Sequence, residues 1–504
     1  MMLVPFAVVL STLHLEGDAL PGNGDYIDVP FTVPAGTVEV QITRAYTTGV
    51  GDILDFGVWS PDGFRGWSGG LTDDVIVGVD QSTRGYLPGP ITPGAWTLEI
   101  GKAQLTPTGA HYALDFTFRD DATLAVLPKA TFAPVTLDGT RRWYKGDFHV
   151  HSSESGDSHA PMADDVMLAH TRGLDFVSLS DHNTISQHAL IAAQQASWPI
   201  LVLRGSEITT YSGHGGGVGI SSYVDHRLGR DGRTIGNVID DVTAQGGAFI
   251  VNHPATNLGT NCIGCAWMHD TDVPWDEVSG MEVLTAGFDI GVQVFTPTVL
   301  KRWDELEDQG HRIAAVTGSD DHSDGMNEGS TGSPIGSPCT VVLADSLSEA
   351  AIVDGLRNHR TIAQLRGPDD PPLEVTMKTK DGGQADIGDD VADIADVELA
   401  IHVTTGSGTF AQLWRDGAKV DQVAVTSDDF RATFHDTPGA ADHRYRVQLI
   451  DDTNRPIVIT SHIYAHGIVA TGGGCNAGAG VGAGPLAALA LFGMRRRRRA
   501  RTAR

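Results

Sequence analysis

Histidines and carboxylates recur between residues 149 and 322, at points where apolar strands are predicted to end. The first motif is GDFHVHSSESGD, in which His149 and His151 are separated by one residue. Alternation along a strand places both imidazoles on one face, and two neutral imidazoles side by side begin a divalent metal site. Asp157 in the following loop offers a hard oxygen ligand. An isolated H-x-H pair is also typical of a strand surface, so this interpretation depends on the other motifs.

The next two strands carry carboxylates as well as histidines at their ends. The apolar strand predicted within GLDFVSLSDHNT ends at Asp181 and His182. An unpaired charge there would be costly to bury. We expect His182 to ligate a metal and Asp181 to orient it, with a local turn network as the alternative. The apolar strand predicted within LVLRGSEI ends at Glu207, a carboxylate whose two oxygens can bridge two cations. His214 follows in a glycine-rich loop that lets the backbone approach a substrate or metal closely.

Two later strands end in the same residue types. The apolar strand predicted within GGAFIVNHPA ends at His253. The strand predicted within HRIAAVTGSDDHS is followed by Asp320 and His322, which are again separated by one residue. Each motif alone has a plain structural explanation, but their repetition at five strand ends is not explained by chance. In α/β barrels the loops at the carboxyl ends of the strands form the active site. The pattern therefore predicts that these residues meet in one metal site.

The predicted elements divide the chain of 504 residues into several domains. Alternating strands broken by Gly, Pro and Asp predict an antiparallel β-sandwich over residues 14–130. Over residues 135–365, apolar strands alternate with helical segments, such as a helix around SQHALIAAQQA, which predicts an α/β barrel-like domain. Alternating strands return over residues 366–468 and predict a C-terminal β-sandwich.

The charge balance argues against nucleic acid as a partner. The chain has 35 basic and 63 acidic residues, a net charge of −28. Seven of the arginines lie in the last ten residues, so the remaining 28 basic and 63 acidic residues give the body a net charge of −35. Such a surface repels a phosphate backbone and favours a soluble particle.

The order of the motifs, H-x-H, S-G-D, S-D-H-N, G-S-E, G-H, N-H-P and G-S-D-x-H, resembles the PHP (polymerase and histidinol phosphatase) superfamily. GDFHVHSSESGD, GLDFVSLSDHNT, TTYSGH and GSDDHS, preceded by a β-domain, are most similar to its carbaryl-hydrolase-like branch, called CehA/McbA. The resemblance implies a distorted (β/α)7 barrel with two or three divalent ions, bridged by Glu207. The implied ligands are His149, His151, Asp157, His182, Glu207, His214, His253, Asp320 and His322.

These residues predict a metal-dependent hydrolase in which a metal-activated hydroxide attacks the substrate. The expected catalytic residues are Asp181, as a proton shuttle, together with His182 and Glu207. The CehA/McbA resemblance implies a small-molecule ester, carbamate or amide substrate, and a phosphoester is the alternative. A phosphomonoester site should offer Arg or Lys to the phosphate; Arg204 and Arg227 are near in sequence but cannot be placed from it.

The metal and a non-enzymatic role stay open at this point. Histidine and carboxylate ligands suit Zn, Mn or Fe. In a different class of function, the metals are structural and the β-sandwiches bind a surface polymer. Structural zinc is closed by four protein ligands, whereas nine ligands for two or three ions leave positions open for water.

The two ends of the chain suggest export. Residues 1–13 are apolar and are either part of a signal segment or the first strand of the domain that follows. Residues 469–504 contain a Gly-rich spacer, a marginal apolar helix and an Arg-rich end. This layout, with Cys475 ahead of the helix, resembles C-terminal sorting signals of the MYXO-CTERM type. The resemblance implies transient membrane anchoring, processing by a sorting protease, and a secreted or cell-surface location.

Four cysteines are too few for a disulfide framework, and the single C-x-x-C motif lacks a second pair to complete a zinc site. Cys262 and Cys265 either close a small loop disulfide, if the protein is exported, or are two incidental loop thiols.

Overall fold

The structure is a computed structural model that describes residues 8–47, 51–69, 73–285, 287–323, 333–394 and 396–467. These residues belong to one compact unit, Met1–Ile468. A second unit, Val469–Arg504, lies outside the described residues, and so do the predicted Gly-rich spacer, apolar helix, Cys475 and Arg-rich tail. None of the helices in the described part of the chain is long and apolar enough to cross a membrane.

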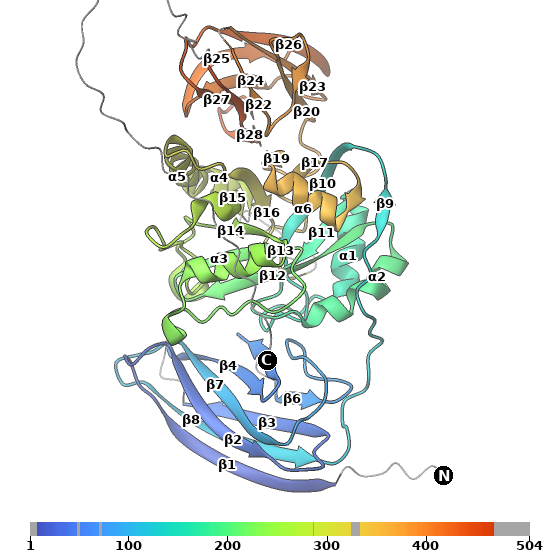
Figure 1. The fold of residues 1–504 in the computed structure, drawn as a ribbon, viewed down its shortest axis with the longest axis vertical. Coiled ribbons are helices and arrows are strands. Elements are labelled where there is room, and N and C mark those ends of the chain that lie inside the picture. Colours follow the sequence, from blue (N-terminus) through green and yellow to red (C-terminus); the bar gives the residue numbers. More distant parts are fainter. Residues whose placement is uncertain are drawn as a thin grey trace, which may run out of the picture. The chain divides into compact units, whose positions relative to one another are not determined.

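The N-terminal region consists of two four-stranded antiparallel sheets. Burial alternates along strands such as Ala110–Arg119, and side chains such as Ile42, Leu98 and Phe116 from both sheets share one apolar core. The sandwich begins before residue 14, because residues 9–13 already pair with the last strand of the region. One sheet contains β1 (Val9–Ala19), β8 (Ala110–Arg119), β3 (Glu39–Tyr46) and β6 (Val75–Gly78); the other contains β2 (Tyr26–Val33), β7 (Gly94–Gln104), β4 (Ile53–Ser60) and β5 (Gly63–Ser68), all drawn in blue in Figure 1.

The central region is a mixed sheet in which seven strands follow one another in chain order. Four neighbouring pairs are parallel, whereas the fourth strand of the series runs antiparallel to both neighbours. The strands are β10 (Arg142–Val150), β11 (Phe176–Leu179), β12 (Leu201–Thr210), β13 (Gly213–Val218), β14 (Ala248–Val251), β15 (Val278–Thr285) and β16 (Ala314–Gly318).

The reversed strand β13 departs from the predicted alternation of strands and helices, because only Tyr211 and Ser212 separate it from β12. Gly213, with a φ of 151°, supplies the backbone conformation that this tight turn requires. The glycines that follow approach protein rather than an open site: a Cβ on Gly215 would clash with the Phe249 ring. The prediction that these glycines let a ligand approach the backbone is therefore wrong: they allow neighbouring side chains to pack closely against the strand.

Backbone hydrogen bonds join the last strand of the series to the first. The Asp320 N–H donates to the His149 carbonyl over 2.8 Å, and the His151 N–H donates to the Asp321 carbonyl over 3.0 Å. These contacts bring the carboxyl ends of β10 and β16 together. The observed architecture is a central mixed sheet with parallel strands, and the distorted seven-stranded barrel stays a prediction that these contacts support.

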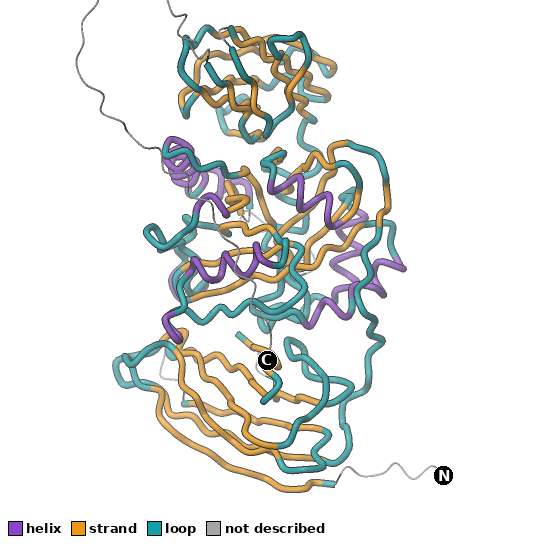
Figure 2. Tube along the Cα trace, in the orientation of Figure 1, coloured by secondary structure: helices purple, strands orange, loops and turns teal. Residues whose placement is uncertain are grey.

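All α-helices of the described residues lie between residues 162 and 357, and Figure 2 shows them in purple around the central strands. The helix expected at SQHALIAAQQA is divided into a 3₁₀ turn, Ser186–Ala189, and α2. The side chains of Gln187 and His188, adjacent in sequence, both reach the Gly205 carbonyl, which a regular α-helix would not permit. The helices are α1 (Met162–Thr171), α2 (Ile191–Ser197), α3 (Ile235–Ala244), α4 (Phe288–Val294), α5 (Thr296–Asp308) and α6 (Glu349–Arg357).

The C-terminal strands fall into two groups. One group forms a separate sheet, and the other group extends the central sheet. The link is β19 (Thr361–Gln364), which pairs with β17 (Cys339–Ala344) on one side and with β28 (Pro456–Thr460) on the other. The extension contains β28, β27 (His443–Ile450), β24 (Phe410–Arg415), β25 (Ala418–Ala424), β29 (Ile463–Ala465) and β22 (Asp390–Val391). The separate sheet contains β21 (Gln384–Ala385), β20 (Leu373–Lys378), β23 (Val397–Thr404) and β26 (Asp429–Asp436), and a short pair joins β9 (Thr136–Asp138) to β18 (Leu347–Ser348).

Candidate metal centre

The structure brings the nine predicted ligand residues to the carboxyl-end side of the central strands. His214 lies at the start of β13 yet on the same side, because β13 runs in the opposite direction. The most buried members are His149, His151, Glu207, His214 and His253, each at most 4% exposed. The more accessible side chains are those of His182, Asp320, His322 and Asp157, at 15%, 25%, 28% and 45% exposed.

Glu207 lies at the centre of this group. Its Oε1 lies 3.2 Å from His149 Nε2, 3.0 Å from His253 Nε2 and 3.4 Å from His214 Nδ1. Its Oε2 lies 2.9 Å from His182 Nδ1 and 3.5 Å from His151 Nε2. The two oxygens of one carboxylate thus face different sets of histidines, which is the arrangement expected of a bridging ligand.

Three of these histidines have one ring nitrogen held by the protein and the other turned toward Glu207. His149 Nδ1 is 2.9 Å from Glu282 Oε1, His214 Nε2 is 3.0 Å from the Ile263 carbonyl, and His253 Nδ1 is 3.2 Å from the Cys265 carbonyl. Since a carbonyl or carboxylate can only accept, the held nitrogen carries the proton. The opposite nitrogen faces Glu207, and a divalent cation bound there would take the place of its proton.

The remaining histidines extend the cluster toward Asp157. His322 Nδ1 is 2.9 Å from the Asp320 carbonyl, and its Nε2 lies 3.4 Å from His182 Nε2. Asp157 Oδ2 lies 3.3 Å from His182 Nε2 and 3.5 Å from His322 Nε2. His151 Nδ1 is 3.0 Å from Ser155 Oγ, which leaves its Nε2 facing Asp320 Oδ1 at 3.2 Å.

Four buried atoms of the cluster have no hydrogen-bond partner in the described part of the chain: His149 Nε2, His151 Nε2, His214 Nδ1 and Glu207 Oε2. A buried polar atom that lacks a hydrogen bond costs about 1–3 kcal/mol, and these four have only ion-pair contacts within the cluster, so a cation bound among them would be favourable. Three overlapping groups, each with its ligand atoms within 4.8 Å of one another, could hold metal ions. They are His149, His151, Glu207 and Asp320; Glu207, His214 and His253; and His151, His182 and His322.

The electrostatics keep the central carboxylate charged and at least one ring neutral. Burial by itself raises the pKa of Glu207, but the rings of His149, His214 and His182 outweigh burial and hold this pKa well below its usual range. Burial, with His322 and His182 adding to it, lowers the pKa of His151 to about 3. An ionised carboxylate beside a neutral imidazole is the protonation state that binds a divalent metal.

Backbone strain accompanies two of the ligand positions. His253 and Asp320 have φ values of 29° and 57°, in the left-handed region that side chains other than glycine rarely adopt. Such strain persists where the surrounding structure enforces it, commonly at functional sites.

Asp181 does not orient the His182 ring. Its Oδ1 accepts hydrogen bonds from the Ser152 and Ser155 N–H groups, and its Oδ2 accepts one from Ser152 Oγ. The His182 ring instead contacts Thr209, whose Oγ1 lies 2.6 Å from Nδ1. Asp181 therefore holds the loop that carries Ser155, and Ser155 in turn contacts His151. The predicted catalytic role of Asp181 remains a prediction.

The structure adds residues that the sequence motifs did not identify as part of the site. Glu282 lies in β15. Its Oε1 lies 2.9 Å from His149 Nδ1, and its Oε2 accepts a hydrogen bond from the His253 N–H over 2.7 Å. Asn252 donates its side-chain amide to Glu207 Oε1 over 2.9 Å. A carboxylate in a buried strand, MEV, was the available signal for Glu282; its partners come from other strands and are not visible in the sequence.

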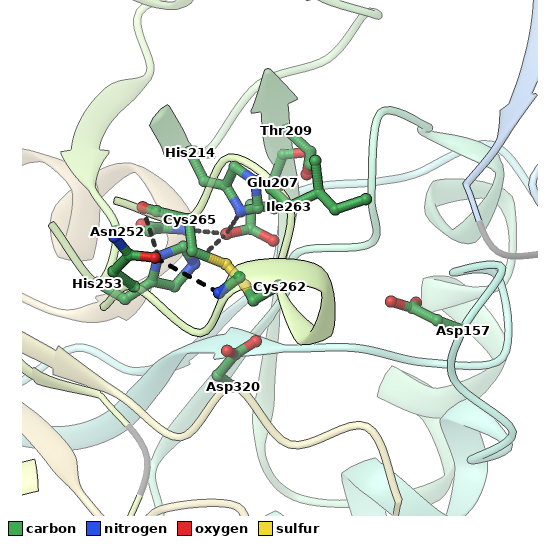
Figure 3. Close-up of a disulfide and its surroundings, with 12 residues drawn as sticks. Asp157, Glu207, Thr209, His214, Asn252, His253, Cys262, Ile263, Cys265 and Asp320 are labelled. Atoms are coloured by element: carbon green, nitrogen blue, oxygen red, sulfur yellow. Dashed lines mark hydrogen bonds and ion pairs between the residues drawn. A yellow bond between two sulfur atoms is a disulfide. The ribbon is translucent and has the colours of Figure 1, made fainter. Parts of the chain in front are cut away.

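Cys262 and Cys265 form a disulfide, which confirms the first of the two predicted states. Figure 3 shows it beside Glu207, His214 and His253. The loop that it closes supplies the Ile263 and Cys265 carbonyls that accept from His214 and His253. The disulfide thus constrains the acceptors that orient two candidate ligands.

Replacing both cysteines by serine, Cys262→Ser with Cys265→Ser, should weaken binding of one metal equivalent about tenfold, because two ligands lose fixed acceptors. Competition with a chromophoric chelator measures this affinity. A reductant should weaken metal binding by the wild-type protein and have no further effect on the double variant. Unchanged affinity in both experiments would show that the loop does not orient the ligands.

A cavity of about 630 Å³ opens next to the cluster and is lined by seven of its residues, among them Asp157, His182 and Glu207. Among the described residues none of those lining it is an arginine or a lysine. The two arginines near the motifs are engaged elsewhere: Arg204 pairs with Glu349 at 2.6 Å, and Arg227 pairs with Glu99 at 2.8 Å.

Comparisons with known proteins found only weak structural similarity. No family model matches the sequence, and no curated protein matches it. The chain is structurally similar to a two-domain protein from Bacteroides vulgatus that contains a predicted PHP-like metal-dependent phosphoesterase, at 18% identity and a TM-score of 0.37, covering 67% of this chain and 100% of that one. It also matches a calcium-binding mutant of Bacteroides uniformis beta-glucuronidase 2 at 11% identity and a TM-score of 0.19, covering 90% of this chain and 60% of that one. Both TM-scores are too low to establish a shared fold, so the chemistry of the site rests on its own geometry.

Proposed function

We propose that this protein is a metal-dependent hydrolase of the PHP type that cleaves an ester, carbamate or amide bond, as in the CehA/McbA branch. One observation carries the proposal. Buried histidines from separate strands each have one ring nitrogen held by an acceptor and the other turned toward Glu207, and four buried atoms of the cluster make no hydrogen bond within the described residues. Structural packing alone does not require such an arrangement.

The residues divide into three ligand groups around Glu207. His149, His151 and Asp320 share one group with it, and His214 and His253 share a second. His151, His182 and His322 form the third, and Asp157 lies within 3.5 Å of His182 and His322. Bound divalent ions supply an activated water and polarise the scissile bond. The chain itself holds the ligands in the required tautomers and shapes the cavity for the substrate.

We assign Asp181 a positioning role in place of proton transfer. It is not among the residues that line the cavity, and both of its oxygens accept hydrogen bonds from the Ser152–Ser155 loop. Burial raises its pKa to about 7, against which the Ser152 and Ser155 hydrogen bonds act. Its contact with Ser155 supports the orientation of His151.

The cavity favours a carboxylic ester, carbamate or amide over a phosphomonoester. A phosphomonoester carries two negative charges, and its recognition normally uses Arg or Lys, which the described lining lacks. Four of the lining side chains are acidic: Asp55, Asp157, Glu207 and Asp320. A phosphoester would depend on bound ions alone for charge compensation, which makes phosphoesterase activity the second candidate.

We also propose that the protein is exported. The Cys262–Cys265 disulfide is typical of an oxidising compartment, which agrees with the secreted or surface location implied by the C-terminal sorting motif. Anchoring and processing at residues 469–504 remain part of this proposal.

The test is to measure bound metal by plasma mass spectrometry and to assay the same sample on a nitrophenyl ester, a naphthyl carbamate and a nitrophenyl phosphate. We expect two or three metal equivalents and turnover of the ester or carbamate that a chelator abolishes. Preference for the phosphate would favour the phosphoesterase. Folded protein that binds no metal and remains inactive after addition of Zn or Mn would overturn the enzyme proposal and leave a surface-binding role.

A further inference from the structure

The cavity beside the metal cluster is lined partly by the N-terminal sandwich. Ile53 and Asp55 of β4, Trp67 of β5 and Ala103 of β7 all line it. The N-terminal region is therefore part of the candidate substrate site.

Specific contacts hold this part of the wall against the central region. Tyr211 follows β12 directly, and its hydroxyl donates to Asp55 Oδ2 over 2.8 Å. Phe64 and Tyr223 stack at 3.5 Å between ring centroids with an interplanar angle of 7°. Glu99, almost fully buried, pairs with Arg227 at 2.8 Å. A buried ion pair of this kind fixes orientation more than it adds stability.

Asp55 presents a carboxylate oxygen to the cavity. The residue is 8% exposed and lines the cavity. Within the described part of the chain its one hydrogen bond is the one that Oδ2 accepts from Tyr211, so Oδ1 has no hydrogen-bond donor there. Burial raises the pKa of Asp55 to about 6, and the Tyr211 hydrogen bond acts against this rise. The charges of His182 and Arg44 also act against the rise, whereas that of Asp157 adds to it.

Aromatic rings accompany this carboxylate. Trp67 and Tyr211 both line the cavity, and Tyr26 stacks on Tyr211 with ring centroids 5.8 Å apart. Gly101 is required here, because a Cβ at that position would clash with the Tyr211 hydroxyl. Farther along the wall lie the apolar side chains of Leu258, Ile263, Ile290 and Phe295.

A carboxylate beside aromatic rings is an environment that recognises an ammonium group. An ionised carboxylate supplies the opposite charge, and aromatic rings attract a cation through their electron-rich faces. The acidic body of the protein also raises the local concentration of cations. An apolar or anionic group in this part of the cavity would leave the charge of Asp55 uncompensated.

Resting on the proposed hydrolase activity, we propose that the pocket selects esters or amides whose non-reacting end carries an ammonium group, bound by Asp55 between Trp67 and Tyr211. The reacting carbonyl lies at the metal cluster and the ammonium group at the N-terminal sandwich. The N-terminal sandwich thereby determines substrate specificity.

The test compares two nitrophenyl esters of straight-chain acids of equal length, one ending in trimethylammonium and the other in tert-butyl. These ends match in size and differ in charge. We expect the wild-type protein to prefer the cationic ester about tenfold or more in kcat/KM, chiefly through KM. Asp55→Asn should abolish the preference by lowering kcat/KM for the cationic ester to that for the tert-butyl ester. Asp121→Asn, which removes an exposed carboxylate of the same region, should keep the preference.

Direct binding separates this inference from the proposed activity. Benzyltrimethylammonium, titrated calorimetrically, should bind the metal-loaded wild-type protein and Asp121→Asn but bind Asp55→Asn at least tenfold more weakly. If neither ester is hydrolysed, the hydrolase proposal fails while this titration still decides the specificity. Equal binding by wild type and Asp55→Asn, or equal wild-type turnover of both esters, would overturn the inference. The wild-type comparison needs no variant and decides even if Asp55→Asn fails to fold.

Discussion

Glu207→Gln is expected to lower kcat/KM about a thousandfold and to reduce the bound metal by at least one equivalent. Its two oxygens lie within 3.5 Å of ring nitrogens from five histidines. An amide lacks the negative charge that compensates a divalent cation, and its NH₂ group would face a histidine lone pair instead of accepting from a donor. Steady-state kinetics and plasma mass spectrometry on the same preparation measure both effects.

The matched control is Glu305→Gln on α5, which removes a carboxylate that is 47% exposed and pairs only loosely with Lys301 at 3.7 Å. It should keep wild-type metal content and activity, because an exposed pair contributes little. If Glu207→Gln retained full metal and full turnover, Glu207 would not be a bridging ligand and the assignment of the centre would be wrong.

Glu282→Gln is expected to weaken metal binding and turnover about 10- to 100-fold without removing a ligand. Glu282 Oε1 holds His149 Nδ1, and Oε2 accepts from the His253 N–H and from Thr285 Oγ1 at 2.5 Å. The carboxylate therefore sets the tautomer of one ligand and the backbone position of another. An amide can satisfy only part of these donors and does not stabilise the charge that His149 acquires on ligation.

A positioning role makes a distinct prediction: excess metal should restore most of the kcat of Glu282→Gln, because its ligands are all still present. Chelator competition gives the metal affinity, and a metal titration of activity gives the rescue. Glu277→Gln, an exposed position just before the same strand, is the control and should behave as wild type. Loss of activity at unchanged metal affinity, with no rescue, would contradict the role assigned to Glu282.

The residue types and their order along the chain were sufficient to predict which residues the fold brings together. Strand alternation relates His149 to His151, and apolar strands that end in Asp, Glu or His indicate a common edge, because parallel strands bring their carboxyl ends to the same side. The N-terminal sandwich was predictable for a similar reason. Alternating apolar side chains require a second sheet to cover them, and Leu98 and Phe116 meet in that core.

The strand pairings between regions were not predictable in this way. The C-terminal strands were expected to form a β-sandwich, and Leu399 and Val447 of its two sheets do share one core, but the pairing of β19 with β28, which joins one of these sheets to the central sheet, was not expected. The reversal of β13 also escaped prediction, although it carries His214 to the site. In both cases the alternation of apolar and polar residues along the strand is the same whichever strand it pairs with and in whichever direction it runs. The pairing is decided by which strand edges remain open in the folded chain, and those edges belong to residues distant in sequence.

The chemistry of the site depends further on the folded chain. The sequence shows that His149, His214 and His253 are present, but only their distant partners, Glu282 and two carbonyls of the disulfide loop, select which ring nitrogen faces Glu207. Asp55 reads as an ordinary residue of an alternating strand until Tyr211, 156 positions later, brings it to the cavity wall. Hydrogen bonds of this kind join atoms whose separation along the chain carries no local signal, so the ligand types follow from sequence whereas their orientation and the shape of the pocket follow from tertiary packing.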